Sequence, residues 1–242
     1  MPILRGIRSE FIKLRHTAVL WIHILIPVLG AAVFLLYFAL YPQVEDSSKM
    51  AFVLELTAIV FPVVISVICG MMAALEEKAA GFQGMLSNKD GRTISYLNKL
   101  AAAIILGGIS TALLVGITFF GISFFSSAQV SYGKFALAAL GMFAGSVPLY
   151  MIQMCLSIKW GLGGSVFVGV IGSLLSIMFS NVDAAIWPFI PFTWGIRILQ
   201  NIIHTTTIST GIELSIVIGV SAIILFLSLV WFQRWEGRKS SE

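Results

Sequence analysis

Six long apolar runs divide this chain, and they restrict its fold more than any other feature. A helix that crosses the roughly 30 Å hydrocarbon core of a bilayer needs about 20 apolar residues. The sequence is 58% hydrophobic and only 11% charged, which is too few charges to cover the surface of a 242-residue water-soluble domain. We therefore predict an all-α, polytopic membrane protein. Its six transmembrane helices are expected at residues 19–41, 51–75, 97–125, 135–158, 162–180 and 212–232.

The basic residues predict the orientation of these helices. If the N-terminus is cytoplasmic, 12 of the 15 Lys and Arg residues fall on the cytoplasmic side and 3 fall outside. Positive charge accumulates in short cytoplasmic loops, so both termini are expected inside the cell. The segments between the runs are too short for a core of their own, and residues 1–242 are expected to form one membrane domain.

The N-terminal segment 3–15 is expected to be an amphipathic helix. Its apolar face recurs at helical spacing through Leu4, Ile7, Phe11 and Leu14. The basic residues away from that face are Arg5, Arg8 and Lys13. Such a helix would lie in the inner membrane interface, with its basic side on anionic headgroups. The alternative is an ordinary positively charged anchor.

A charged loop, residues 76–99, separates the second and third apolar runs. It holds 7 of the 26 charged side chains and is expected in the cytoplasm. Residues 76–86 predict a short amphipathic helix, in which Phe82, Met85 and Leu86 would be available to dock in a partner's groove. The alternative is a solvated loop whose charges only mark the inner side.

The outer segment 181–211 contains Pro188 and Pro191, which preclude one continuous helix. Trp187 and Trp194 are candidate contacts for an amphipathic substrate, although tryptophans at this depth also serve as interface anchors.

Small residues recur at four-residue spacing in two of the runs. They are Gly141 and Gly145 in the fourth, and Gly161, Ser165, Gly169 and Ser173 in the fifth. This pattern permits close helix approach, either within the chain or between chains.

Several function classes are disfavoured. The chain has no G-x-x-x-x-G-K-[ST] motif to bind ATP, and its three histidines have no metal-binding spacing. No apolar run carries a central charged residue of the kind that relays ions. Glu76-Glu77 resembles the start of the glutamate-pair motif of intramembrane CAAX-type proteases. However, Gly81 stands where that motif needs Arg, so we expect no enzyme, no catalytic residue and no metal site.

The sequence resembles the permease subunits of type-2 ABC exporters, and most of all the small lantibiotic-immunity permeases of Gram-positive bacteria. The likeness covers nearly the whole chain. It rests on the six runs, the missing ATPase and three motifs: Glu10-Phe11-Ile12-Lys13, Glu76-Glu77-x-x-x-Gly81-x-x-x-x-Leu86 and Gly91-Arg92-x-x-x-Tyr96-x-x-Lys99. The sequence departs from the class at Asn88-Lys89-Asp90, where a Pro often precedes the Arg.

The resemblance implies a role for each part. Segment 3–15 would be the interface helix, and 76–86 the coupling helix seated on a separate, dimeric ATPase that binds ATP and Mg. The coupling residues would be Glu76, Glu77, Phe82, Met85, Leu86 and Arg92. A second permease subunit, a different chain, would complete the pathway in a bacterial plasma membrane. This chain would bind no cofactor of its own and no nucleic acid.

The implied cargo is a cationic, amphipathic lanthipeptide bacteriocin, whose removal from the membrane confers self-immunity. Two alternatives remain open. One is an ABC exporter permease for another cargo, such as a drug, lipid or polysaccharide. The other is a membrane immunity protein or assembly scaffold that transports nothing.

Overall fold

A computed structural model describes residues 2–87, 91–125, 131–180, 186–204 and 208–237. These residues are almost entirely helical and include no strand. The elements are α1 (Pro2–Leu14), α2 (Ala18–Leu40), α3 (Asp46–Ala80), α4 (Gln83–Leu86), α5 (Arg92–Phe125), α6 (Tyr132–Phe179), η1 (Trp187–Phe189), η2 (Pro191–Thr193), α7 (Trp194–His204) and α8 (Ile208–Arg234).

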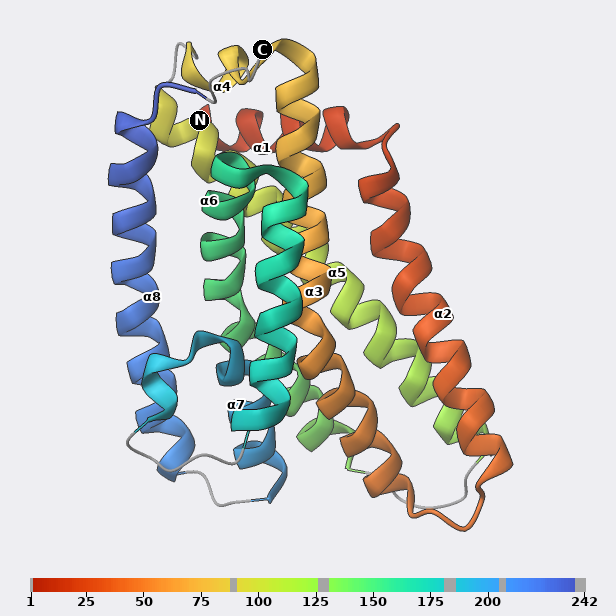
Figure 1. Ribbon diagram of the computed structural model, residues 1–242. Helices are drawn as coiled ribbons and strands as arrows, with labels where there is room; N and C mark the ends of the chain where they lie inside the picture. Colours follow the sequence, from red (N-terminus) through yellow and green to blue (C-terminus); the bar gives the residue numbers. More distant parts are fainter. Residues whose placement is uncertain (1, 88–90, 126–130, 181–185, 205–207, 238–242) are drawn as a thin grey trace.

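The long helices form a bundle, and α1 lies across one end of it (Figure 1). The same end holds α4 and the last turn of α8, at the top of Figure 1. We call it the α1 end. Segment 3–15 was predicted to be a helix, and the structure confirms it as α1, Pro2–Leu14. Leu14 is buried in the main core, whereas Leu4 is 64% exposed, so the predicted apolar face is only partly covered.

Among the described residues, five helices are long and apolar enough to cross a membrane when α6 is counted once. However, α6 is a helical hairpin rather than one rod. Gly161 has φ 77° and ψ −172°, outside the helical region. The two arms of α6, before and after Gly161, lie side by side in Figure 1. The hydroxyls of Ser157 and Ser165 are 2.8 Å apart, whereas eight residues of a straight helix would separate them by about 12 Å. The arms correspond to the predicted runs 135–158 and 162–180, and six crossings stay a prediction.

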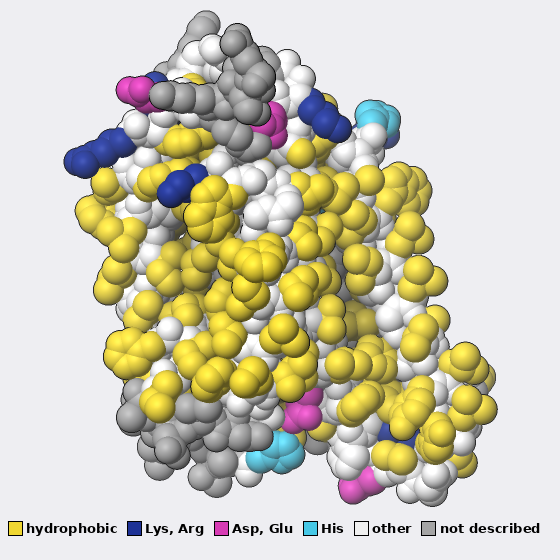
Figure 2. All heavy atoms as spheres, in the orientation of Figure 1, with side chains coloured by type: hydrophobic (Ala, Val, Ile, Leu, Met, Phe, Trp, Pro, Cys, Tyr) yellow, Lys and Arg dark blue, Asp and Glu magenta, His cyan; other side chains and the backbone are white. Residues whose placement is uncertain are grey.

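Apolar side chains cover the middle of the molecule, as Figure 2 shows for one face, and charged side chains gather toward the two ends. Many large apolar side chains are exposed, for example Phe124 at 85% and Met178 at 72%. A water-soluble protein rarely exposes apolar surface on this scale, whereas lipid solvates it. The exposed apolar surface around the middle of the molecule therefore supports the prediction of a membrane protein.

The predicted small-residue motifs bring helices together within the chain. A Cβ on Gly145 would lie 2.9 Å from the carbonyl oxygen of Trp194, so only glycine lets α7 pack this closely on α6. A Cβ on Gly169 would lie 2.8 Å from the carbonyl oxygen of Pro62 in α3. The packing of α3 against α6 is the most extensive in the bundle. These motifs therefore join α6 to α7 and to α3.

Candidate functional site

Four charged side chains from three helices meet at the α1 end of the bundle. Nζ of Lys99 lies 2.7 Å from Oε2 of Glu10 and 2.9 Å from Oε1 of Glu76. Nζ of Lys13 lies 2.7 Å from Oε1 of Glu10 and 3.0 Å from Oε1 of Glu76. We call Glu10, Lys13, Glu76 and Lys99 the four-charge cluster. It ties α1 to the end of α3 and to the beginning of α5.

Local sequence brings these groups together. Glu10 and Lys13 are three residues apart on α1, so they share one face of that helix. Glu76 lies in the last turns of α3, and Lys99 lies two turns into α5. The α1 backbone comes so close to α5 that a Cβ on Gly6 would collide with the side chain of Asn98. Close packing therefore seats α1 where its charges reach both long helices.

Three of the four side chains in the cluster are buried. Lys99 is 2% exposed, and Glu10 and Glu76 are also buried, whereas the Lys13 side chain is half-exposed. Two carboxylates and two ammonium groups leave no formal net charge. Burial acts to lower the pKa of Lys13, but hydrogen bonds and attraction from Glu10 and Glu76 outweigh it and raise the pKa above its ordinary value. The two neighbouring carboxylates thus favour the charged form of Lys13.

The chain turns a sharp corner next to this cluster, and the corner changes the expectation for residues 76–86. Helix α3 continues to Ala80, and Gly81 and Phe82 both take left-handed conformations, with φ 56° and 67°. Helix α4 contains only Gln83–Leu86. The prediction of one amphipathic helix over 76–86 is therefore wrong. Two helical pieces meet there, because the Gly81 conformation ends α3.

The corner also hides the apolar side chains that were expected to be available. Phe82 is 1% exposed and Met85 3% exposed. The Phe82 ring meets Trp235 edge to face, with centroids 5.0 Å apart. The expectation that Phe82 and Met85 are free docking anchors is therefore wrong for this conformation, since they pack inside the chain. The corner instead exposes polar and small groups, including Lys78 and Gln83.

Arg92, another predicted coupling residue, fastens the same corner to the end of α8. Its Nε donates to the carbonyl of Leu86 at 3.3 Å, and its Nη1 donates to the carbonyls of Gln233 and Trp235 at 3.1 and 3.2 Å. Leu86 is half-buried, as is Glu77. The guanidinium thus satisfies carbonyls that α4 and α8 leave free at their ends.

The remaining α1 residues divide between surface and core. Arg5 and Arg8 are exposed, so they are free to meet headgroups or a partner. Phe11 is half-buried and packs against the main core. One side of α1 therefore exposes Arg5 and Arg8, and the other side packs against the bundle.

Trp187 and Trp194, the candidate substrate contacts, lie inside the opposite end of the molecule. Trp194 is fully buried and Trp187 is 3% exposed. Nε1 of Trp194 donates to the Trp187 carbonyl at 3.1 Å, and Arg197 lies 5.2 Å from the centre of the Trp187 ring. Both indoles are covered, so the expectation that they contact a substrate is wrong for this conformation.

Sequence reasoning missed two members of the four-charge cluster as site residues, Glu10 and Lys99, and also missed Trp235. The available signal was weak. Glu10 and Lys13 form an i,i+3 pair, and Lys99 lies three residues inside an apolar run, where an unpaired charge would be unfavourable. The pairing of Lys99 with Glu10, 89 residues apart, became visible only in three dimensions.

The described residues include no group of three or more His, Cys, Asp or Glu that could hold a metal ion. Comparison with known proteins gave no match, either to a protein-family model or to a curated protein.

Proposed function

We propose that this chain is the membrane-spanning subunit of an ATP-driven exporter, with six crossings and both termini in the cytoplasm. The single observation that carries the proposal is the four-charge cluster. It joins a helix that lies across the bundle to the ends of two long membrane helices. A force on α1 or on the neighbouring corner would move α3 and α5 together.

The absence of an ATP-binding motif and the exposed corner beside α4 support a transporter that takes its energy from a partner protein. The sequence has no ATP-binding motif, so the energy for transport must come from a partner. Helix α4 packs on α3 and α5 at the α1 end, and Lys78 and Gln83 are exposed beside it. A soluble ATPase dimer that docks on this exposed corner would shift the helices between two packings. A second permease chain would complete the pathway.

The cargo we propose is a cationic, amphipathic lantibiotic, expelled from the membrane to protect the producing cell. This part of the proposal rests on the sequence resemblance to lantibiotic-immunity permeases. An amphipathic peptide collects in the membrane interface, where a permease could take it up laterally.

The test is protection of cells against a lantibiotic by variants of the exposed corner. We expect the double variant Lys78→Glu/Gln83→Glu to protect no better than a deletion, because both side chains are exposed and their replacement leaves the packing intact. Lys134→Glu, equally exposed at the opposite end, is the matched control and should protect fully. Normal protection by the double variant would rule out this docking surface.

Two further results would redirect the proposal. Sensitivity of the deletion strain to drugs of unrelated chemistry would assign another cargo. Protection that persists when the partner ATPase is inactivated would favour a non-transporting immunity protein.

A further inference from the structure

An apolar slot of about 190 Å³ runs between α2, α3 and α5. One face of α2 lines it from Ile22 to Phe34, and one face of α3 lines it from Leu56 to Ile68. Helix α5 forms the back of the slot, and Tyr150 of α6 contributes to its lining. All three long helices belong to the candidate membrane spans, so the slot lies within the apolar part of the molecule.

The slot is long and narrow. On both α2 and α3 its lining extends over 13 residues, and the 12 steps between the first and the last, at a rise of 1.5 Å each, span about 18 Å. The hydrocarbon of one leaflet, half of a roughly 30 Å core, is about 15 Å deep. The slot has room at its middle, since a Cβ placed on Gly30 would meet only Leu114, at 3.6 Å, which is an ordinary van der Waals contact. One extended hydrocarbon chain matches this shape.

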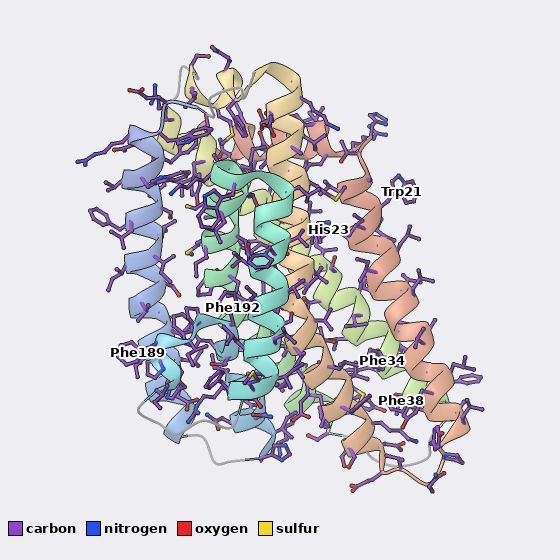
Figure 3. All side chains as sticks on the ribbon, in the orientation of Figure 1. Trp21, His23, Phe34, Phe38, Phe189 and Phe192 are labelled. Carbon is purple, nitrogen blue, oxygen red and sulfur yellow. The ribbon has the colours of Figure 1, made fainter. Side chains whose placement is uncertain are left out.

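One polar atom in the slot has no partner. His23 is 3% exposed and lines the slot near the α1 end, and Figure 3 shows its side chain on the side of α2 that faces the bundle, with Trp21 on the other side. Its Nδ1 lies 2.7 Å from the Val19 carbonyl oxygen and must therefore carry the proton of that hydrogen bond. Its Nε2 has no hydrogen-bond partner among the described residues. In the neutral ring Nε2 is an acceptor, and a buried acceptor without a donor is unfavourable.

The slot's hydroxyl-bearing side chains on α3 and α5 do not supply that donor. Thr57 donates to Val53, Ser110 to the backbone carbonyl of His23, and Thr111 to Gly107. Each hydroxyl is thus engaged with a backbone carbonyl. The chemistry that completes the site is one O–H donor at the His23 end.

We propose that this slot binds an amphiphile with one hydrocarbon chain and a hydroxyl group, the chemistry of a monoacylglycerol. The hydroxyl donates to Nε2 of His23, and the chain extends along α2 and α3 toward Phe34. A polypeptide does not fit, because its backbone groups would need many hydrogen-bond partners in a slot whose lining is almost entirely apolar. The inference needs only that the helices cross a bilayer and does not rest on the proposed transport.

The test uses the full chain in lipid nanodiscs and two photoreactive probes. One is a long-chain alcohol with a diazirine in mid-chain, and the other is the methyl ether of that alcohol, which has no donor. We expect labelling of peptides from α2 and α3, with the alcohol labelling roughly 2- to 10-fold more than the ether at equal concentration, as a single hydrogen bond allows. Equal labelling by the two probes, or labelling elsewhere only, would overturn the proposal.

Two variants sharpen the result. Gly30→Leu should fill the slot and abolish labelling, whereas Gly116→Leu on α5 has open space around it, lies outside the slot, and should label like the wild type. His23→Phe keeps a ring but removes the acceptor, so the alcohol should lose its advantage over the ether. Unchanged labelling in Gly30→Leu, or an unchanged preference in His23→Phe, would show that the slot is not the binding site.

Discussion

Lys99 and Glu76 form a 2.9 Å ion pair where α5 begins and α3 ends, and both side chains are almost fully buried. Glu10 of α1 shares the same ammonium group at 2.7 Å. Isolated surface ion pairs contribute little to stability, but a buried network leaves uncompensated charge if one member is removed. The link between α1 and the long helices can therefore be tested through stability as well as through function.

Lys99→Met should destabilise the protein strongly. The change leaves Glu10 and Glu76 buried with only the half-exposed Lys13 between them. Removing one partner of a buried pair costs about 3–5 kcal/mol, which corresponds to a Tm lower by roughly 6–20 °C for a chain of this length. Thermal unfolding in detergent measures it. The matched control is Lys78→Met, an exposed lysine, which should keep the wild-type Tm.

Alkaline pH should remove the stabilising effect of Lys13, because it deprotonates the ammonium group. Its pKa is raised above the ordinary value of 10.5, so its stabilising effect is fully present below that pH and is lost as the pH rises through the folded-state pKa. We expect the Tm of the wild type to fall more steeply above pH 10.5 than that of Lys13→Met. Parallel alkaline profiles for the two proteins would show that Lys13 takes no part in the cluster.

Phe82→Ala separates internal packing from partner docking. Phe82 is buried against Trp235, so its truncation should lower the Tm of the purified chain by roughly 6 °C or more, without any partner present. Gln83→Ala, at the next and exposed position, should leave it unchanged. An unaltered Tm in Phe82→Ala would instead mean that Phe82 serves a surface outside the chain.

Gly161→Ala tests the hairpin of α6. The backbone at Gly161 lies where residues with a Cβ are strained, so this variant should lower the Tm by several degrees. Gly163, two residues later, has ordinary helical geometry with nothing close to a Cβ, and Gly163→Ala should be neutral or slightly stabilising. Equal Tm values for the two variants would contradict the sharp reversal at Gly161.

The membrane helices were predictable because lipid demands long apolar segments that carry their own backbone hydrogen bonds. The ends of these helices were not predictable, because a helix can continue beyond its apolar run into charged sequence. The run predicted as 51–75 became α3, Asp46–Ala80. That extension carried Glu76 into the four-charge cluster.

The site was less predictable for a related reason. Helical spacing placed Phe82 and Met85 on one face, but spacing does not say what covers that face. Trp235, from the far end of the chain, covers Phe82. Likewise, the sequence predicts Trp187 and Trp194 as substrate contacts or interface anchors, and the packing of α7 on α6 buries Trp194. Local pattern identified these residues, and long-range packing decided their roles.

The measurement that tests the central claim most directly is ATP hydrolysis by the complex isolated with this chain from its own membrane and returned to liposomes. We predict that a P-loop ATPase subunit accompanies the chain and hydrolyses ATP, that a lantibiotic stimulates this hydrolysis, and that Lys78→Glu/Gln83→Glu abolishes the stimulation. A chain that isolates without ATPase activity, from cells it still protects, would contradict the account.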